Sequence, residues 1–445
     1  MSSNTNFSSK LGVIAATVGS AVGLGTVWRF PSVAQENGGS VFLITYLLCV
    51  FLMGIPVMLA EFTIGRGSRM DALGAFRTLT PNTRWWIIGV LGVLAPYLIL
   101  MYYMVVAGWT LEYLWLSISG DLFSGANGFE GTMNEAIRST WSPIFWTAMM
   151  IFLNLFVLLR GVKKGIEKMS NILMPLLFVI LLVFCGVSLQ LPNAMDGVKY
   201  FLQPDFSKFD SNVLISALGQ AFFSLSLGMG ILITYSSYYP SRVKLAKTSF
   251  TVSSLVFLIA VLMGLIIFPA MRSFGIEGGT EGTTLVFITL PQIFTQLPMP
   301  QLWAILFFAL LVVAALTSTV SVAEVPIALI CTSLNISRKN ACLIVLLPML
   351  VFCSLCSLSM SGVGIELFGM GLFDFLDFFT SNILLPIVAF FVCIYVGYVL
   401  PKKLFFNEIT NNYTVKTPLA KVFFLFIRFV APLLILLVFI NSLFL

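Results

Sequence analysis

Long apolar segments alternate with short polar loops along almost the whole chain. Each segment holds roughly 20 residues, which is the length that crosses about 30 Å of hydrocarbon as an α-helix. The pattern predicts an all-α polytopic membrane protein with eleven transmembrane helices. Their approximate bounds are 10–30, 40–64, 87–117, 142–159, 169–190, 212–239, 246–270, 301–332, 340–358, 375–400 and 418–444.

Two of the segments are interrupted by glycines near their centres. The first reads GSAVGLG over residues 19–25, and the sixth contains FFSLSLGMG over residues 222–230. A broken helix exposes backbone N–H and C=O groups, which are costly in lipid unless a polar ligand or an ion completes them. Close packing of helices through small residues is the alternative, and it explains one such interruption better than two in matching positions.

The paired interruptions predict an inverted repeat, because the sixth segment enters the membrane from the side opposite to the first. Two repeats of five helices then place the discontinuous helices 1 and 6 against each other, and one extra helix follows at the C-terminal end. The predicted units are a cytoplasmic tail at 1–9, a first repeat at 10–190, an extracellular connection at 191–211, a second repeat at 212–400, a cytoplasmic loop at 401–417 and a last helix at 418–445.

The composition excludes a water-soluble domain, because 59% of the residues are hydrophobic, 9% are charged and the mean hydropathy is +1.02. The polar start lacks the charged region of a signal peptide, so the first segment is predicted to be a mature span. Histidine is absent from the sequence, which removes the usual proton relay and the commonest metal ligand. The seven cysteines lie in or beside apolar segments and are typical of small core residues.

Lysine and arginine gather in alternate loops, whereas the other loops are mostly acidic. The positive-inside rule therefore predicts a cytoplasmic N-terminus and an extracytoplasmic C-terminus in the cytoplasmic (plasma) membrane. Because the net charge of +6 follows this topology, it indicates a lipid bilayer and no nucleic-acid partner. The basic loops hold Arg66, Arg69, Arg77, Arg84, Arg160, Lys163, Lys164, Lys168, Arg242, Lys244, Lys247, Arg338, Lys339, Lys402, Lys403, Lys416 and Lys421.

Seven segments occur in the order of a known family pattern. They are GSAVGLGTVWRFPSVAQENGGSVF, IPVMLAEFTIGR, YYMVVAGWTLEYL, FFSLSLGMGILITYSSY, LVFITLPQIF, AALTSTVSVAEVPIAL and FDFLDFFTSNILLP. They resemble the signature segments of the neurotransmitter:sodium symporters, from about residue 10 to residue 400. The resemblance implies a shorter bacterial member in the cell inner membrane with the leucine-transporter-type fold. It also implies sodium coupling and an amino-acid-like substrate.

The resemblance implies two sodium sites. The second site of the family lies between spans 1 and 8, and its pattern is intact here. Two hydroxyls and three backbone carbonyls give a neutral, all-oxygen cage that suits a hard monovalent cation. The matching positions are Gly19, Val22, Ala314, Thr317 and Ser318.

The first sodium site departs from the family pattern. The matching positions are Ala21, Thr26 and Ser224. Thr26 replaces one of two usual asparagines and still offers an oxygen, but the other falls on Val256, which offers none. Ser253 or Ser254 substitutes for it if the register slips. We expect sodium to be weakly bound or absent here.

The resemblance also implies an amino-acid pocket. Gly23 stands where monoamine-carrying relatives place an aspartate, so a substrate carboxylate has room to accept N–H bonds from Leu24 and Gly25. Tyr103 is expected to donate to the same carboxylate. Carbonyls of Ala21, Phe223 and Ser226 are expected to meet the ammonium group, and the side-chain pocket is predicted to consist of Ile99, Phe223, Ser226, Met229, Ser318 and Val322. This uncharged lining favours neutral, hydrophobic substrates.

An extracellular gate is implied by Arg29 and Asp377, with Tyr103 and Phe223 as an inner lid. A charge at the depth of Arg29 is costly unless it is paired and faces water. Asp374 is the competing partner, and a static structural ion pair is the alternative to a gate.

Two acidic residues lie inside predicted spans. Glu61 is predicted to accept hydrogen bonds from backbone N–H groups freed by the break in span 6. Glu324 is predicted to be unpaired and to line the inward pathway, with a hydrogen-bonded interior carboxylate as the alternative.

The cytoplasmic gate lacks the family's usual arginine and aspartate, because the corresponding positions are Asn4, Phe7 and Thr332. We expect the salt bridge to be absent, and closure to rely on packing of Phe7 and polar contacts around Tyr238. An inward-open state should then be easier to reach than in relatives that have the pair.

These patterns predict a sodium-coupled secondary active symporter of neutral amino acids. A non-transporting amino-acid-binding receptor or scaffold that kept the fold is the alternative. An enzyme is disfavoured because the sequence has no metal-ligand cluster, histidine dyad or nucleotide motif. The sequence leaves open which amino acid is carried, whether chloride or protons are coupled, and whether the protein forms a homodimer.

Overall fold

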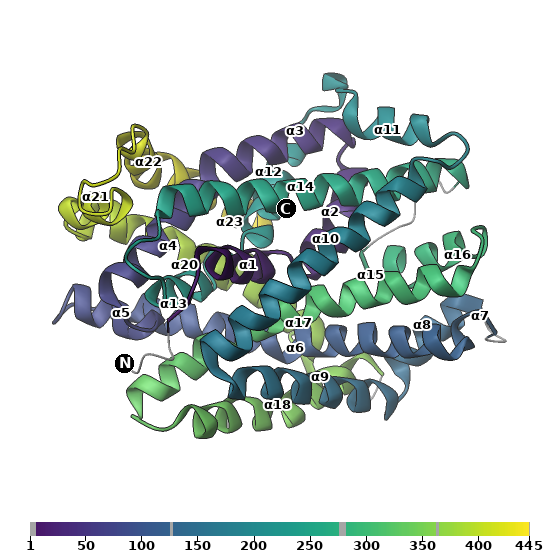
Figure 1. Ribbon diagram of the computed structural model, residues 1–445, viewed down its shortest axis with the longest axis horizontal. Coiled ribbons are helices and arrows are strands. Elements are labelled where there is room, and N and C mark those ends of the chain that lie inside the picture. Colours follow the sequence, from purple (N-terminus) through teal and green to yellow (C-terminus); the bar gives the residue numbers. More distant parts are fainter. Residues whose placement is uncertain (1–5, 125–127, 276–281, 362–364, 445) are drawn as a thin grey trace.

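The computed structural model describes residues 6–124, 128–275, 282–361 and 365–444. Figure 1 shows long helices that run side by side along the longest axis of the molecule. The helices α5 (Ala72–Leu79) and α21 (Lys402–Ile409) lie at one end of this bundle, and α7 (Asp121–Ser124) and α8 (Gly128–Arg138) lie at the other. We call these the α5 end and the α8 end.

Nine helices in the described part of the chain are long and apolar enough to cross a membrane, and several contain a single π-helical turn. They are α3 (Ser40–Cys49) continued by α4 (Ile55–Ser68), α6 (Trp86–Ser119), α9 (Ser142–Leu159), the turn Val162–Glu167 continued by α10 (Lys168–Ser188), α14 (Leu245–Ser273), α17 (Pro300–Ser333), α18 (Arg338–Met360), α19 (Leu372–Phe378) continued by α20 (Leu385–Ile394), and α22 (Ala420–Leu425) continued by α23 (Ala431–Phe444).

The first span is broken. It consists of α1 (Lys10–Ala21), a π-helical turn at Gly25–Arg29 and α2 (Phe30–Glu36), and the two halves are bent by 60°. Val22, at the bend, has left the helical conformation, with φ −88° and ψ 72°. Counted as one span, this bent pair is the tenth.

The sixth predicted span is broken as well. The helices α12 (Ser211–Ser224) and α13 (Ile231–Ser237) are separated by residues 225–230, which are not helical. Three of these residues have left-handed backbone: Ser226 (φ 53°), Gly228 (φ 77°) and Gly230 (φ 64°). The predicted all-α polytopic fold with discontinuous helices 1 and 6 is thereby confirmed, and the structure is compatible with eleven spans.

Shorter elements connect the spans. Within the described ranges the one sheet is a hairpin of two-residue strands. Besides α5, α7, α8 and α21, the connecting elements are α11 (Ala194–Leu202), a 3-10 turn at Phe206–Lys208, α15 (Gly282–Thr284), a π-helical turn at Leu285–Thr289, α16 (Leu290–Thr295), β1 (Glu366–Leu367) and β2 (Met370–Gly371).

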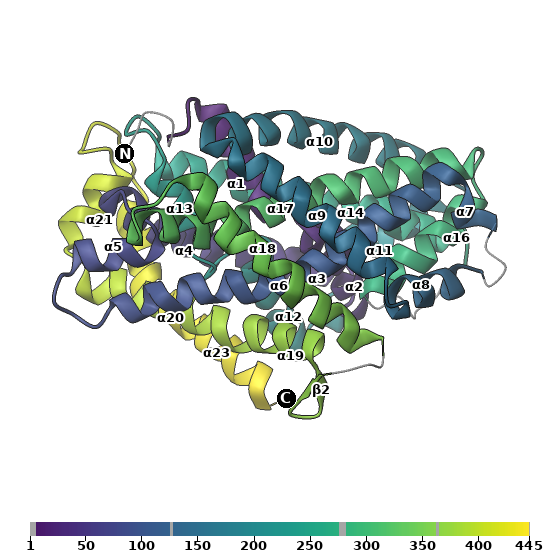
Figure 2. The same ribbon diagram turned by 90° about the horizontal axis from the view of Figure 1, so that it is seen from below.

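Polar residues fix where the helices begin. The side chain of Ser9 accepts a hydrogen bond from Gly12 N–H (2.9 Å) at the start of α1, and Asp210 accepts one from Val213 N–H (2.8 Å) at the start of α12. The most extensive helix packing is between α17 and α6, and α1 packs against α17, α10 and α14 (Figures 1 and 2). Continuous helices therefore surround α1, the first half of the broken first span.

Candidate functional site

A cavity of about 380 Å³ lies between the two helix breaks. The break after α1, the non-helical segment after α12 and the facing sides of α6 and α17 form its walls. All of its lining side chains are uncharged. They are Ser20, Ala21, Gly23, Gly25, Ile99, Tyr103, Phe223, Ser226, Met229, Ser318 and Val322.

The structure brings together every residue that the sequence proposed for substrate binding except Leu24, which lies behind the cavity wall. Leu24 is fully buried, and its backbone N–H donates a hydrogen bond to Tyr103 Oη (3.0 Å). Ser20 was missed by the sequence analysis, although it lies inside the GSAVGLG segment. Its carbonyl accepts hydrogen bonds from Ser226 Oγ (2.9 Å) and Ser318 Oγ (3.4 Å), so it joins the two breaks to α17.

Gly23 allows the closest approach in the polar part of the cavity. A Cβ atom at this position would lie 2.6 Å from Tyr103 Oη and 2.8 Å from Ser318 Oγ. Real Cβ atoms do not come that close to other heavy atoms, so this arrangement has no room for an aspartate. The cavity therefore carries no fixed negative charge beside the break.

The residues proposed for the second sodium site lie where α1 meets α17, and all are buried. Thr317 Oγ1 donates to the carbonyls of Val313 (2.9 Å) and Ala314 (3.1 Å), and a Cβ atom on Gly19 would lie 3.3 Å from Thr317 Cβ. Hydroxyls and backbone carbonyls are the donor atoms present, and they fit a monovalent cation with oxygen ligands. The proposed set is Gly19, Val22, Ala314, Thr317 and Ser318.

The residues proposed for the first sodium site are only partly assembled. Thr26 Oγ1 donates to the Ala21 carbonyl (3.2 Å), whereas the hydroxyl of Ser224 bonds to Tyr46 Oη (2.7 Å). Val256 is fully buried and offers no oxygen. Ser253, the alternative, is also fully buried, and its Oγ has no hydrogen-bond partner among the described residues. A weak first site stays a prediction.

Glu61 supports the break between α12 and α13. Its side chain is fully buried, and Oε1 accepts a hydrogen bond from Gly228 N–H (2.8 Å). Gly228 has left the helix, so its N–H has no helical acceptor. This is the type of contact expected for Glu61, and its role in transport stays a prediction.

At the α8 end, the guanidinium group of Arg29 packs over the ring of Phe223, a residue of the predicted inner lid. Its guanidinium carbon lies 5.0 Å from the centre of the Phe223 ring. The ion pairs found within 4.0 Å in the described ranges do not join Arg29 to Asp377 or to Asp374. Asp377 instead accepts a hydrogen bond from Ser381 Oγ (3.2 Å). The Arg29–Asp377 gate therefore stays a prediction, for a state with this end closed.

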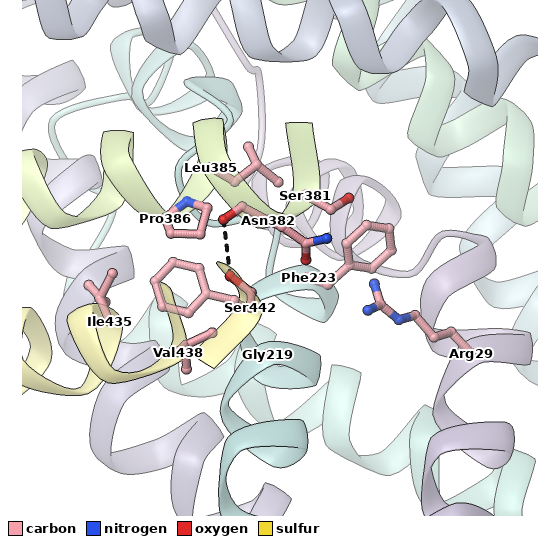
Figure 3. Close-up of a pocket in the computed structure, with 11 residues that line it drawn as sticks. Arg29, Gly219, Phe223, Ser381, Asn382, Leu385, Pro386, Ile435, Val438 and Ser442 are labelled. Carbon is pink, nitrogen blue, oxygen red and sulfur yellow. Dashed lines mark hydrogen bonds between the residues drawn. The ribbon is translucent and has the colours of Figure 1, made fainter. Parts of the chain in front are cut away.

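A second cavity, of about 500 Å³, opens on this side (Figure 3). Arg29 and Phe223 line it together with residues of α23 and the segment before α20, where Ser442 Oγ donates to the Asn382 carbonyl (3.2 Å). Phe223 also lines the first cavity. The Phe223 ring, covered by Arg29, thus separates the two cavities.

The α5 end is closed by aromatic packing. Phe7 is buried, and its ring packs against Tyr235, Tyr238 and Tyr239 at centroid distances of 5.7, 6.4 and 5.9 Å. Its N–H donates to the Tyr238 carbonyl (3.2 Å). Phe7 therefore packs as expected, while Asn4 lies outside the described residues.

One expectation for the α5 end was wrong, and its alternative, a hydrogen-bonded interior carboxylate, is what the structure shows. Glu324 is fully buried but not unpaired, because it accepts hydrogen bonds from Tyr238 Oη (3.0 Å) and from Arg338 (2.9 and 2.5 Å). An ion pair does lie at this end, between Glu324 and Arg338 rather than between the positions of Asn4 and Thr332. Thr332 instead donates to Asp71 Oδ2 (2.5 Å). The sequence placed Arg338 among the basic loop residues, because the hydrophobic pattern does not show that the start of α18 folds back against α17.

Comparison with known proteins identifies the family. The model described as "Sodium:neurotransmitter symporter family" matches residues 4–136 and 129–445. The chain belongs to this symporter family. It is 36% identical to the uncharacterized sodium-dependent transporter YhdH of Bacillus subtilis, over 98% of this chain and 97% of that protein. An uncharacterized sodium-dependent transporter of Haemophilus influenzae is 35% identical over 98% of each.

A solved structure of the symporter family matches the whole chain. The crystal structure of MhsT in complex with L-phenylalanine has a TM-score of 0.90 and 39% identity, and the match covers 98% of this chain and 99% of MhsT. The family consists of multi-pass membrane transporters rather than enzymes, and sodium use follows from membership. The helix breaks and buried oxygen donors are therefore found in a protein of the expected class.

Proposed function

We propose that the protein is a symporter that couples sodium entry to uptake of a neutral, hydrophobic amino acid by alternating access. The observation that carries this proposal is the uncharged cavity between the two helix breaks. One side of this cavity offers backbone groups and hydroxyls, and the other offers apolar side chains. That division matches a zwitterion with an apolar side chain, and it gives no partner for an acidic or basic one.

The polar side of the cavity can bind both charges of an α-amino acid. The N–H groups of Leu24 and Gly25 lie where the helix restarts, so they favour a carboxylate, and Tyr103 Oη lies beside them. Carbonyls of Ala21, Phe223 and Ser226 lie at the two breaks and favour an ammonium group. The apolar side consists mainly of Ile99, Met229 and Val322. The L-phenylalanine in the MhsT complex is an amino acid of this type.

Sodium is cargo in this proposal. The site formed by Gly19, Val22, Ala314, Thr317 and Ser318 supplies neutral oxygens, so a bound sodium ion provides the positive charge there. The site near Thr26 has fewer oxygens, so we propose that coupling depends mostly on the other one. A Hill coefficient near two for sodium in uptake would contradict this part of the proposal.

The two ends of the bundle act as gates. Arg29, Phe223 and Asp377 lie towards the α8 end, which we assign to the outside. Phe7 and the Glu324–Arg338 pair close the α5 end, which we assign to the cytoplasm because the predicted basic loops gather there. The C-terminus is then extracytoplasmic.

Reconstituted protein in liposomes tests the proposal. With an inward sodium gradient, labelled L-phenylalanine or L-leucine should accumulate, whereas L-glutamate and L-lysine should not, and a potassium gradient should give no accumulation. Tyr103→Phe should reduce uptake, because it removes the hydroxyl beside Leu24. Tyr97→Phe is the matched control, since Tyr97 lies on the same helix and packs against Phe352. Binding without accumulation would instead favour the non-transporting receptor.

A further inference from the structure

A basic cavity of about 400 Å³ lies at the α5 end, between the first turns of α1 and α14. Its lining contains three lysines and two threonines, and no acidic residue. The nearby carboxylate of Glu167 is already occupied, because it accepts four hydrogen bonds from Ser8 and Ser9. The lining residues are Lys10, Ile14, Val243, Lys244, Lys247, Thr248 and Thr251.

An apolar groove of about 660 Å³ adjoins this cavity and runs between α1, α10 and α14. Ile14 lines both spaces, so the cavity and the groove adjoin at this residue. Figure 1 shows α1, α10 and α14 in the same region of the bundle. Apart from Asn171, the groove is lined by apolar residues, which are Leu11, Ile14, Ala15, Val18, Met174, Pro175, Phe178, Leu255 and Ile259.

The lining of α14 changes from basic to apolar along a single helix face. Lys244, Lys247, Thr248 and Thr251 are followed by Leu255 and Ile259, which gives the positions i, i+3, i+4, i+7, i+11 and i+15 of one helix face. At 1.5 Å per residue, the distance from Lys244 to Ile259 is about 22 Å along the helix. This exceeds half of a hydrocarbon core of about 30 Å, and so spans a headgroup region and most of one leaflet.

We propose that the cavity and the groove together form a binding site for one anionic phospholipid of the cytoplasmic leaflet. The ammonium groups of Lys10, Lys244 and Lys247 bind the phosphate, the hydroxyls of Thr248 and Thr251 complete it, and an acyl chain fills the groove. The proposal rests on the orientation given under the proposed function, because the lysines must face the leaflet that carries anionic lipid.

The apolar groove decides between a lipid and a free anion. Free phosphate needs only the lysines, whereas the groove continues from them into the hydrocarbon region of a membrane protein. A phospholipid is the molecule in that membrane that has a phosphate at this depth and a chain directly below it. The site also joins α1, half of a broken helix, to the continuous helices α10 and α14.

Native mass spectrometry of the detergent-purified protein tests the proposal. Phosphatidylglycerol and phosphatidylcholine with the same acyl chains are titrated separately. One phosphatidylglycerol should be retained preferentially. Replacing Lys10, Lys244 and Lys247 by Gln should weaken its retention about 100-fold. The matched control replaces the exposed Lys339, Lys403 and Lys416, which line neither space, by Gln and should retain the lipid.

A second variant tests the groove with all lysines present. Leu255→Trp should fill the groove and weaken retention about tenfold, whereas Leu258→Trp, on a lipid-facing position of the same helix, should not. Equal loss in both lysine triples, or equal retention of the two lipids, would overturn the proposal. Competition by inorganic phosphate together with no effect of Leu255→Trp would assign the lysines to a free anion. Lipid retention is measured without sodium or amino acid. A failure of the lipid site can therefore be distinguished from a failure of the proposed transport.

Discussion

Gly23 shapes the cavity by lacking a side chain. Its Cα faces Tyr103 Oη and Ser318 Oγ, the two hydroxyls that border the polar side of the cavity. Any Cβ there must displace at least one of them, and the Tyr103 hydroxyl also accepts the Leu24 N–H bond. One absent methyl group thus keeps three polar groups aligned.

Gly23→Ala should therefore abolish most amino-acid binding while leaving the protein folded. We expect the amino-acid concentration that gives half of the maximal thermal stabilisation to rise about tenfold or more, because a lost hydrogen bond to a charged group costs roughly 1.5–3 kcal/mol. Gly186→Ala is the control, since a Cβ atom there meets nothing within 4 Å. An unchanged midpoint in Gly23→Ala would show that the substrate binds elsewhere.

Thr317 and Thr319 give a matched test of the second sodium site. Both are buried in α17, and both hydroxyls already donate to carbonyls of the preceding turn. Only Thr317 faces Gly19. Thr317→Val should raise the sodium concentration needed for half-maximal uptake about tenfold or more, and Thr319→Val should leave it unchanged. Equal effects of the two would remove Thr317 from the site.

At the scale of single residues, the sequence predicted most of the side chains that line the cavity. It did not predict which charged side chains form ion pairs. Gly23, Tyr103 and Ser226 could be placed because each lies in a segment whose order and spacing match a family. The Glu324–Arg338 pair could not be placed, because it depends on how the chain turns between α17 and α18. Ser20 was missed because its contribution is a backbone carbonyl, which has no signal in side-chain identity.

The two broken helices are supported by a neighbouring continuous helix and by each other. Gly228 is held by Glu61 of α4, and the carbonyl of Gly25 accepts a hydrogen bond from the Gln220 side chain (3.1 Å). Backbone groups left free inside a membrane must find such partners. The glycine patterns predicted both interruptions, but not the 60° bend of the first.

The Glu324–Arg338 pair should hold the α5 end closed. It connects the start of α18 to α17 and, through Tyr238, to Phe7 at the start of the chain. Removing one partner of a buried pair leaves the other charge uncompensated, typically at about 3–5 kcal/mol. Glu324→Gln should therefore increase hydrogen–deuterium exchange in residues 6–12, measured in sodium without amino acid.

Glu408→Gln is the matched control for that experiment. Glu408 forms an ion pair with Arg66, which is also buried, but it contacts neither Phe7 nor Tyr238 in the described structure. It should lower thermal stability without raising exchange in residues 6–12. Equal exchange in Glu324→Gln and the unmodified protein would show that aromatic packing alone closes this end.

The molecule as a whole has two different ends. The α5 end combines buried ion pairs, Phe7 packing and most of the loop lysines and arginines. At the α8 end, Arg29 covers Phe223 and forms no ion pair with another described residue, and a cavity opens beside it. The described state is therefore closed at one end and more open at the other. The sequence predicts a number and a sidedness for the spans, but it does not predict which end is closed, because that depends on side-chain contacts between distant spans.

Sidedness gives the last prediction, since it decides whether the closed α5 end faces the cytoplasm. Alkaline phosphatase is active only outside the cytoplasm, so a fusion after the last helix should be active and a fusion in the loop after Lys403 should be inactive. The basic residues of this loop include Lys402, Lys403 and Lys416, which the positive-inside rule keeps inside. A green fluorescent protein fused at the same two positions should give the opposite pattern. If both reporters reversed, Phe7 and Arg338 would close the outer side, and the assignment of the two gates would have to be exchanged.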